Sequence, residues 1–374
     1  MSNGAWAQRG IPSPTPNAPT TQTTLMTIDN LVRPNIKALK PYRAARHDHV
    51  SGVLLDANEN SFGSALSFEG LELNRYPDPY QLALRGKLGL LYGVQSENIF
   101  LGVGSDEAID LLIRIFCEPT SDSILVIEPT YGMYRVAAGI NNVEVRSVLL
   151  TDDFQIDLPA TLNALGPRTK IIFCCSPNNP TANMLRREDI LALCSQAHAL
   201  VVVDEAYLDF ADSPSLSDRV NSVPNLVILR TLSKAWGLAG IRLGCAIADP
   251  AIISLLLKIK APYNINDLTS AEALKALENG ALIKRTTAAI IAERGRLAED
   301  LHSIPYIRQV FPSDANFLLV RCENAPAVHA LLAQKGIIVR DRSSEPKLAN
   351  CLRITVGTPE QNDLLIKTMK ELSL

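Results

Sequence analysis

Residues 225–249 read NLVILRTLSKAWGLAGIRLGCAIAD. Two apolar runs in this stretch, NLVILRTL (225–232) and RLGCAIAD (242–249), predict strands, and a small-residue turn between them carries Lys234. Both runs are apolar at consecutive positions, which is expected of strands that are buried on both faces. The stretch therefore predicts the interior of a sheet, with a lysine at the end of a buried strand.

Four further β-branched apolar runs precede this stretch: SILVIEP (123–129), VEVRSVLL (143–150), KIIFCCSP (170–177) and ALVVVDEAY (199–207). Amphipathic segments such as RREDILALCSQAHAL (186–200) lie between some of them. Strand–helix–strand order predicts an α/β fold, with a large domain whose mainly parallel sheet is covered by helices.

The pattern changes after about residue 265. A helical stretch from about 270 to 303 precedes three short apolar runs, NFLLVR (316–321), GIIVRD (336–341) and CLRITVG (351–357). These elements predict a second, smaller α+β domain, and 374 residues exceed what one core usually serves. The expected division is a tail (1–25), an N-terminal segment packing with the small domain (26–70), a large domain (71–275) and a small C-terminal domain (276–374).

The composition is that of a soluble globular protein, with 47% hydrophobic residues, 20% charged residues and a net charge of −3. No basic excess indicates a nucleic-acid partner, and the longest apolar runs, such as 252–260, are too short to span a membrane. Seven cysteines without regular spacing favour a reducing, cytoplasmic compartment.

Two N-terminal features have plain interpretations. Residues 1–25 are rich in Pro, Thr, Ser and Asn and carry only Arg9 as a base, which favours a disordered tail over a targeting peptide. His47-Asp48-His49 suggests a metal, but no cysteine or second histidine pair completes a ligand set. A polar loop and no metal site are therefore expected.

Polar residues follow the predicted strands at their carboxyl ends, where open α/β sheets bind ligands. Asp204 ends the run VVV, Asn179 follows FCCSP, and Lys234 follows VILRTLS. A buried carboxylate needs a cationic partner, and burial lowers the pKa of a lysine and makes its amine nucleophilic.

Pyridoxal phosphate accommodates these groups. It binds a lysine amine covalently, and its ring nitrogen needs an acid partner such as Asp204 to stay protonated. Asn179 and Tyr207 can serve its phenolic oxygen, while Ser233 and Arg242 flank the lysine for its phosphate.

A second phosphate element is the stretch FLGVGSDEAIDLLIRIF (100–116), in which Ser105 is expected to cap a helix. The dinucleotide motif G-x-G-x-x-G is absent, because position 107 is Glu107. Asp106 and Glu107 would repel a phosphate unless their side chains turn outward. The alternative is a capped helix whose acids complement the helix dipole.

The chain resembles the type I pyridoxal-phosphate aminotransferases in the stretches RTLSKAWGLAGIRLG (230–244), SPNNPT (176–181), VVVDEAY (201–207), GVGSDEAIDLL (102–112) and EPTYGMY (128–134). It is similar to the histidinol-phosphate aminotransferase family in LDANEN (55–60), RYPD (75–78), SDANFLLVR (313–321), VRDR (339–342) and CLRITVGT (351–358). The motifs run in the family's order from about residue 28 to the end.

The resemblance implies a role for each matching position. Lys234 would bind the cofactor covalently, Asp204 would pair with its ring nitrogen, and Asn179 and Tyr207 would bond its phenolic oxygen. Tyr131 would stack on the ring. The residues expected at the cofactor phosphate are Ser105 and Asp106 through their backbone amides, Ser233, Arg242, and Tyr76 from the neighbouring subunit of a homodimer.

The same resemblance assigns substrate contacts to Tyr42, Asn58, Arg340 and Arg353. In CLRITV, strand alternation points Arg353 opposite to its apolar neighbours, and two arginines suit a dianionic phosphate. Five of the residues assigned to the site have plain alternatives: Lys234 as a solvated charge, Tyr207 as a capping aromatic, Tyr131 as a core aromatic, Arg242 in an ordinary ion pair, and Arg340 in an ion pair with Asp341 or another surface acid.

The implied reaction is transamination of L-histidinol phosphate with 2-oxoglutarate, giving imidazole-acetol phosphate and L-glutamate, in histidine biosynthesis. The alternatives are an aromatic amino acid aminotransferase or a phosphothreonine decarboxylase on the same scaffold, and a non-catalytic regulatory domain. One position departs from the family: its Asn-Pro-Thr-Gly reads here Asn179-Pro180-Thr181-Ala182, and alanine tolerates positive φ less well than glycine.

Overall fold

The structure, a computed structural model, describes residues 1, 27–42, 45–47 and 52–372. Apart from Met1, the tail expected at residues 1–25 lies outside the described residues, as do Asp48 and His49. Within the described ranges, no three His, Cys, Asp or Glu side chains gather as metal ligands. No helix within them has the length and apolar character needed to cross a bilayer.

The large sheet has seven strands in the order β1-β7-β6-β5-β4-β2-β3. Strand β7 runs opposite to the other six strands, so the mainly parallel sheet predicted from the sequence is confirmed. The strands are β1 (Ile99–Val103), β2 (Ser123–Glu128), β3 (Glu144–Leu149), β4 (Thr169–Cys175), β5 (Leu200–Asp204), β6 (Leu226–Thr231) and β7 (Leu243–Ala248).

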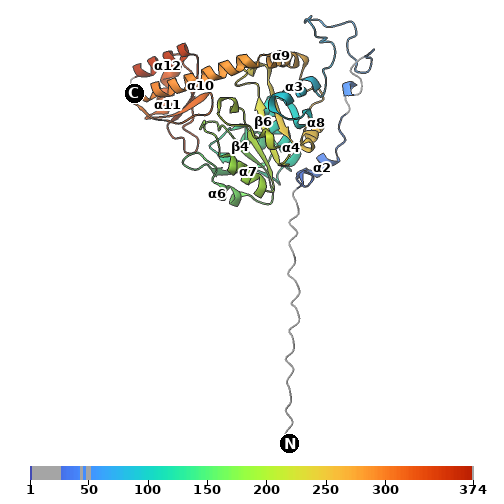
Figure 1. Ribbon diagram of the computed structural model, residues 1–374, viewed down its shortest axis with the longest axis horizontal. Coiled ribbons are helices and arrows are strands. Elements are labelled where there is room, and N and C mark those ends of the chain that lie inside the picture. The colour runs from blue at the N-terminus through green and yellow to red at the C-terminus, as the bar shows by residue number, and fades with distance from the viewer. Residues whose placement is uncertain (2–26, 43–44, 48–51, 373–374) are drawn as a thin grey trace.

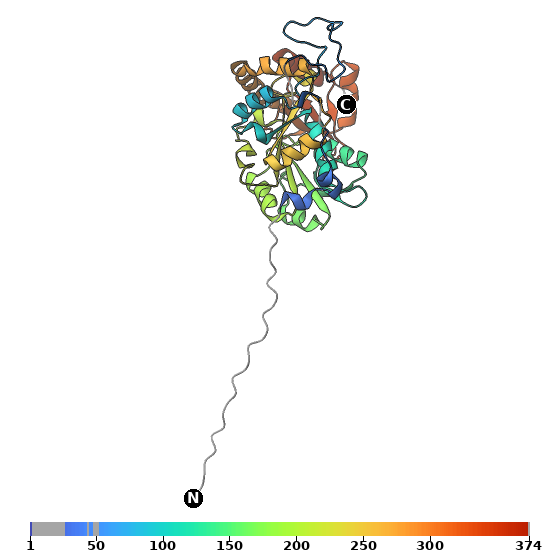
Figure 2. The ribbon, with the colours of Figure 1, turned by 90° about the vertical axis from the view of Figure 1, so that its right-hand side faces the viewer.

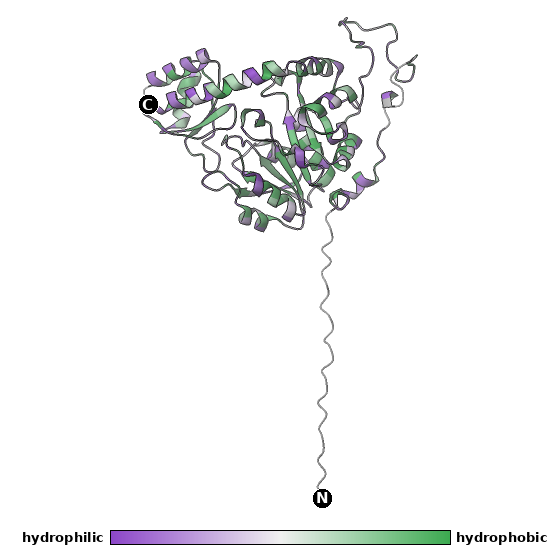
Figure 3. Cartoon of the chain, in the orientation of Figure 1, coloured by the Kyte–Doolittle hydropathy of each residue, from purple (hydrophilic) through white to green (hydrophobic). Residues whose placement is uncertain are grey.

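Both faces of this sheet are buried, which explains the consecutive apolar positions. On β5, Val201 and Val203 join one core cluster, while Leu200 and Val202 join the other. One face is covered by α4 (Ser105–Phe116), α5 (Met133–Ile140) and α8 (Pro250–Ile259). The other is covered by α3 (Leu82–Tyr92), α6 (Leu158–Ala164), α7 (Arg187–Gln196) and α9 (Asp267–Leu277). Figures 1 and 2 show these layers, and Figure 3 shows hydrophobic strands between them.

The small domain contains an antiparallel sheet in the order β10-β11-β9-β8. Its elements are β8 (Ile307–Val310), β9 (Phe317–Cys322), β10 (Arg340–Asp341), β11 (Cys351–Thr355), α10 (Gly280–His302), α11 (Ala325–Gln334) and α12 (Pro359–Glu371). Leu352 and Ile354 of β11 pack against the three helices. Phe317 and Leu319 of β9 point the other way and join a core cluster of the large sheet. Arg353 therefore faces the large domain, as the predicted alternation requires.

Several elements differ from the expectation. Strands β1 and β8 were not predicted, and only two residues of GIIVRD form a strand. The long helix expected at 270–303 is wrong as a single element, because it breaks between α9 and α10 at Glu278 and Asn279. The break lies next to Asn279 and Gly280, which are both poor helix formers. Short 3₁₀ turns lie at Ala45–His47, Ser96–Asn98, Leu208–Phe210, Leu216–Arg219 and Ala239–Ile241.

The first described segment contacts the large domain. Helix α1 (Ile28–Leu31) buries its apolar residues with α4 and α8, and Lys258 donates hydrogen bonds to the carbonyls of Ile36 and Lys37 in α2 (Pro34–Ala38). From the sequence, residues 26–70 are expected to pack with the small domain instead. The apolar side chains of α1 pack on the surface formed by α4 and α8. The domain boundaries expected from the sequence stay predictions.

Candidate active site

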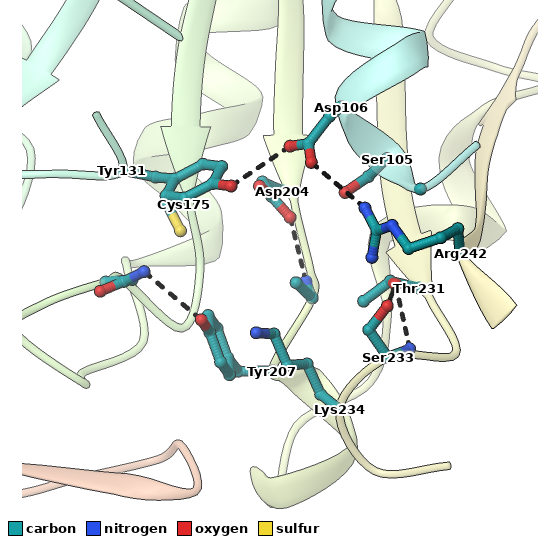
Figure 4. Close-up of a pocket in the computed structure, with 13 residues that line it drawn as sticks. Ser105, Asp106, Tyr131, Cys175, Asp204, Tyr207, Thr231, Ser233, Lys234 and Arg242 are labelled. Atoms are coloured by element: carbon teal, nitrogen blue, oxygen red, sulfur yellow. Dashed lines mark hydrogen bonds and ion pairs between the residues drawn. The ribbon is translucent and has the colours of Figure 1, made fainter. Parts of the chain in front are cut away.

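A cavity opens at the carboxyl ends of β4, β5 and β6, next to the N-terminus of α4 (Figure 4). Nine of the ten residues expected to contact the cofactor line it. Its lining comprises Gly104, Ser105, Asp106, Tyr131, Cys175, Asn179, Asp204, Ala206, Tyr207, Thr231, Ser233, Lys234 and Arg242. The sheet edge thus gathers side chains that lie more than a hundred residues apart in sequence.

Lys234 projects into this cavity from the turn that follows β6. Its Nζ lies 5.3 Å from the centroid of the Tyr207 ring. The amine is open to solvent through the cavity but surrounded by protein, and this partial desolvation lowers its pKa, as does the nearby Arg353 guanidinium. A larger fraction of the amine is therefore neutral and nucleophilic near pH 7 than for a surface lysine.

Asp204 is buried at the end of β5, with a relative exposure of 3%. Burial raises the pKa of Asp204 to about 6, while hydrogen bonds from the Tyr134 hydroxyl and the Ala206 N–H act to lower it. A cation placed in the cavity beside this carboxylate would favour the ionised form. The site is therefore suited to hold a protonated ring nitrogen.

Three polar side chains form a chain from the large to the small domain. Asn179 donates a hydrogen bond from Nδ2 to the Tyr207 hydroxyl at 3.3 Å and accepts one at Oδ1 from Arg353 Nη1 at 2.6 Å. Burial raises the pKa of Tyr207, so its hydroxyl stays protonated. Tyr207 does precede a 3₁₀ turn, as the alternative of a capping aromatic requires. That alternative does not account for the hydrogen bond between its hydroxyl and Asn179.

The start of α4 has the geometry of an anion cradle. Gly104, at φ +73°, precedes the helix, and a Cβ there would lie 2.6 Å from Arg242 Nη2. A Cβ at Gly244 would lie 2.3 Å from the backbone N of Ser105. The space is therefore kept free of side chains, and the first-turn N–H groups have no intrahelical acceptor. Ser105 is the first helical residue, so its expected role as N-cap is wrong: Gly104 holds that position, because it must adopt the positive φ.

The hydroxyls beside this cradle are also ordered. Thr231 lies at the end of β6, and its hydroxyl is 3.0 Å from Ser233 Oγ and accepts a hydrogen bond from the Ser233 N–H. Ser233 thus faces the cavity together with Arg242, whose positive φ of 55° turns the chain back into β7.

The two acids in the first turn of α4 have different environments. Glu107 turns away, since its carboxylate accepts hydrogen bonds from the Val103 N–H and Asn264. Asp106 does not turn outward: it lines the cavity, accepts a hydrogen bond from Tyr131 at 3.2 Å and lies 3.6 Å from Arg242. Glu107 therefore meets the condition that the acids turn outward, whereas Asp106 does not, because the two donors hold its side chain at the cavity.

A second cavity adjoins the first and shares Tyr131 and Asn179 with it. Arg340 and Arg353, which lie opposite each other on β10 and β11, both line it. Asp341 accepts hydrogen bonds from Ser343 instead of pairing with Arg340, and the described residues offer Arg340 no ion-pair partner within 4.0 Å. Two guanidinium groups are thus available to an anionic substrate.

Sequence reasoning missed several neighbours of these cavities. Arg342 and Glu345 form a partly buried ion pair of 2.5 Å in the wall of the second cavity. The spacing of three residues in RSSE was the available signal for this pair. Cys175 lies beside Asp204 in the first cavity, and Tyr134 contacts Asp204 from behind. Tyr134 is the last residue of EPTYGMY and lies in the first turn of α5, three positions after Tyr131, which precedes the helix.

Three expected contacts lie elsewhere. Tyr42, Asn58 and Tyr76 belong to the segment between α2 and α3, which we call the arm. Its described residues are 39–42, 45–47 and 52–81, and they extend from the body of the molecule in Figure 1. None of the three lines either cavity. Tyr42 and Asn58 are exposed, and Tyr76 stacks on Tyr263 with ring centroids 4.5 Å apart. One chain alone does not bring these residues to the site.

Ala182, at the position of the family's glycine, adopts the left-handed conformation itself, with φ 70°. Its N–H donates to the Asn178 carbonyl and its carbonyl accepts from the Asp314 N–H, both at 2.7 Å. The turn therefore keeps its course, and Asn179 keeps its place in the cavity.

Comparisons with known proteins agree with this geometry. Residues 45–369 match the family described as aminotransferase class I and II. The chain is 50% identical over 349 residues to a histidinol-phosphate aminotransferase of Parabacteroides distasonis, covering 93% of this chain and 99% of that one. It is 47% identical to that of Christiangramia forsetii, covering 92% and 98% of the two chains.

Solved structures share the fold. The histidinol-phosphate aminotransferase of Sinorhizobium meliloti, in complex with pyridoxal-5'-phosphate, matches with a TM-score of 0.72 and 25% identity, over 80% of this chain and 83% of that one. That of Clostridium acetobutylicum matches with a TM-score of 0.74 and 25% identity, over 80% and 90%. The chain thus belongs to the class I and II aminotransferases and, within them, to the histidinol-phosphate aminotransferase family.

Proposed function

We propose that this protein transaminates L-histidinol phosphate with 2-oxoglutarate, giving imidazole-acetol phosphate and L-glutamate, as a step of histidine biosynthesis. The observation that carries the proposal is the pair of adjoining cavities. One places Lys234 with Asp204, Asn179 and Tyr207, and the other presents two arginines. A cytoplasmic location is part of the proposal, supported by seven cysteines that are all free thiols.

The residues of the first cavity fit pyridoxal phosphate. Lys234 would bind its aldehyde, Asp204 its ring nitrogen, and Asn179 with Tyr207 its phenolic oxygen. The cradle at α4, kept open by Gly104 and Gly244, would receive the phosphate. The donors there would be the backbone N–H groups of Ser105 and Asp106, the Ser233 hydroxyl and Arg242.

Bound pyridoxal phosphate supplies an electron sink for the electron pair left when a substrate Cα loses its proton. Lys234 Nζ is placed to take that proton, because its lowered pKa leaves the amine able to accept it. Asp204 keeps the ring nitrogen protonated, and the Tyr131 ring covers one side of the cavity. Tyr207 and Asn179 would donate hydrogen bonds to the phenolic oxygen and so would orient the cofactor.

Arg353 and Arg340 support the substrate assignment. Arg353 Nη1 touches Asn179 and so lies at the boundary between the two cavities, where a substrate joined to the cofactor would extend. Arg340, on the neighbouring strand, adds a second guanidinium for a dianionic phosphate. The same two groups suit the side-chain carboxylate of glutamate, the second amino donor.

We also propose a homodimer with shared active sites. The arm exposes large apolar side chains, among them Val53, Leu55 and Phe62, each more than three-quarters exposed in the single chain. Contiguous exposed apolar surface of this kind marks protein contact sites. A partner subunit on this surface would bring Tyr76 to the cofactor phosphate, and Tyr42 and Asn58 to the substrate.

A substrate panel tests the reaction. The purified protein, supplied with pyridoxal phosphate, is assayed for glutamate release with 2-oxoglutarate and either histidinol phosphate or phenylalanine, and for CO₂ release from phosphothreonine. We expect kcat/KM for histidinol phosphate to exceed that for phenylalanine by at least about 100-fold. Faster turnover of phenylalanine, or CO₂ release from phosphothreonine, would reject the proposed substrate.

Mixed dimers test the shared site. Lys234→Ala is combined with an arm variant that carries Tyr42→Ala, Asn58→Ala and Tyr76→Ala. If the arm serves the partner subunit, random mixing restores up to about a quarter of wild-type activity, because half the dimers are hybrids with one complete site. If each arm serves its own subunit, the mixture is no more active than its components.

A further inference from the structure

Tyr134 contacts the buried face of Asp204. Its hydroxyl donates a hydrogen bond to Asp204 Oδ2 at 2.9 Å, and its side chain is fully buried. It reaches this carboxylate from α5, whereas the cavity opens on the other side of Asp204. No residue expected at the site from the sequence makes this contact.

The Tyr134 ring is held on two sides. It stacks on Phe173 of β4 with centroids 4.5 Å apart and planes within 9° of parallel. Tyr131 packs against it edge-on, with centroids 5.5 Å apart and planes at 86°. Rings packed in this way have few alternative rotamers, so the hydroxyl position is set by the core. The donor is therefore preorganised before any ligand enters.

The two oxygens of Asp204 have separate donors. Oδ1 accepts the N–H of Ala206 at 3.1 Å, and Oδ2 accepts the Tyr134 hydroxyl at 2.9 Å. Two donors in fixed positions define the plane of the carboxylate. Because each carboxylate oxygen has two lone pairs, the carboxylate still has acceptor capacity toward the cavity.

Tyr134 also affects the charge of Asp204. Burial raises the pKa of Asp204, and the hydrogen bond from Tyr134 is the largest of the interactions that lower it. The other charged groups acting on this carboxylate are Asp106, which raises its pKa, and Lys234, which lowers it. Without the Tyr134 donor, Asp204 would bind its own proton more strongly and offer less negative charge to a neighbouring cation.

We propose that Tyr134 is a positioning residue that orients Asp204 and keeps it ionised, so that Asp204 leaves the proton on the cofactor's ring nitrogen. The proposal rests on the proposed function, since it concerns the same bound cofactor. In this arrangement the electron sink depends on a tyrosine that touches neither cofactor nor substrate.

Tyr134→Phe tests the proposal, because it removes only the hydroxyl and keeps the ring that stacks on Phe173. We expect pyridoxal phosphate to bind about 10-fold more weakly, as loss of one hydrogen bond to a charged group predicts. We expect kcat to fall about 10-fold, with KM for histidinol phosphate changed by less than about 2-fold. The ¹⁵N resonance of a ring-labelled cofactor should move toward the neutral pyridine position.

A matched control is Tyr306→Phe. Tyr306 is also a buried tyrosine with one hydrogen bond, from its hydroxyl to the Met369 carbonyl at 2.7 Å, but it lies in the core of the small domain. This variant should lose comparable stability and keep the wild-type cofactor affinity and ¹⁵N resonance. A purely structural role for Tyr134 would make the two variants alike.

A measurement on the apoprotein separates this inference from the proposed function. ¹³C NMR of labelled aspartate should show a higher pKa for Asp204 in Tyr134→Phe than in the wild type. Wild-type protein that binds no pyridoxal phosphate would reject the proposed function, whatever that pKa does. A wild type that binds it normally, with an unchanged Asp204 pKa or an unchanged ring-nitrogen resonance in Tyr134→Phe, would overturn the inference alone.

Discussion

The sheet-edge cavity and the arm both carry residues expected at the active site, but they are built differently. In the cavity, Asp204 and Asn179 are buried and have hydrogen-bond partners in the same chain. In the arm, Tyr42 and the apolar side chains of Val53, Leu55 and Phe62 are exposed. One chain thus supplies nine of the ten residues expected at the cofactor, whereas the arm presents an exposed apolar surface.

The arm is nevertheless ordered internally. Arg46 and Glu59 form an ion pair in which each side chain is only 4% exposed, and Arg75 adds a second contact to Glu59 at 2.9 Å. Although burial acts to raise the pKa of Glu59, hydrogen bonds from the Tyr76 N–H and Arg75 make its net shift downward. An arm with a fixed interior and an apolar exterior is suited to docking as a preformed unit.

Lys234→Ala gives the largest expected effect, and it acts on the cavity alone. Transamination should fall at least about 1,000-fold, because both the covalent attachment and the Cα proton transfer depend on this amine. Borohydride should no longer fix the cofactor to the protein, as mass spectrometry would show. Lys335→Ala, a surface lysine after α11, is the control and should retain full activity. Residual borohydride-stable cofactor in Lys234→Ala would reject the assignment.

Asp204→Asn should change activity and stability in opposite directions. Activity should fall about 100-fold or more, because a neutral amide does not hold a proton on the ring nitrogen. The apoprotein should become about 1–3 kcal/mol more stable at pH 7, because a buried charge is removed. Activity assays and chemical denaturation of the apoprotein measure the two effects.

The pH dependence gives a second check on Asp204. The folded pKa of about 6 lies above the usual carboxyl value, so the folded apoprotein binds this proton more strongly than the unfolded chain. The stability that this group contributes is fully present below about pH 4 and is lost as the pH rises through about 6. The Asn variant should lack this loss, and identical pH profiles for the two proteins would contradict the burial argument.

The sequence predicted the cavity better than the arm for a physical reason. Strands buried on both faces are recognisable from local composition, and parallel strands end at one edge, so Asp204, Asn179 and Lys234 could be expected together. Tyr134 was missed because its contact depends on how α5 packs on β4, which no local pattern encodes. Strand β1 was not predicted because Gly102 within it and Gly104 just after it were interpreted as a turn. The arm residues Tyr42, Asn58 and Tyr76 were assigned from the family resemblance alone, because no local pattern indicates what packs on an exposed segment.

Glu59→Gln tests the arm and should have a smaller effect. Neutralising Glu59 removes one of the two carboxylates that pair with Arg46, leaving it Asp56 at 2.7 Å, and also removes the carboxylate that pairs with Arg75, which should loosen the arm. We expect activity to fall about 10-fold while cofactor stays bound through Lys234, because the cavity does not depend on the pair. Glu69→Gln, at an exposed position of the arm, is the control. Wild-type activity and dimer content in Glu59→Gln, measured by assay and sedimentation, would show that the interior of the arm is dispensable.

Ala182→Gly should have the smallest effect, because two contributions nearly cancel. Glycine relieves the left-handed strain at φ 70°, worth about 1–2 kcal/mol. It also removes a fully buried methyl group, at about 1 kcal/mol, and frees the unfolded chain, at about 0.5–1 kcal/mol. The free energy of unfolding should therefore change by less than about 1 kcal/mol.

The control is Ala315→Gly, which removes an equally buried methyl group at a residue whose φ is not positive. This variant should be destabilised by about 1–2 kcal/mol. Equal losses in the two variants, measured by denaturant unfolding, would mean that Ala182 carries no strain and that the cavity edge accepts alanine as readily as the family's glycine.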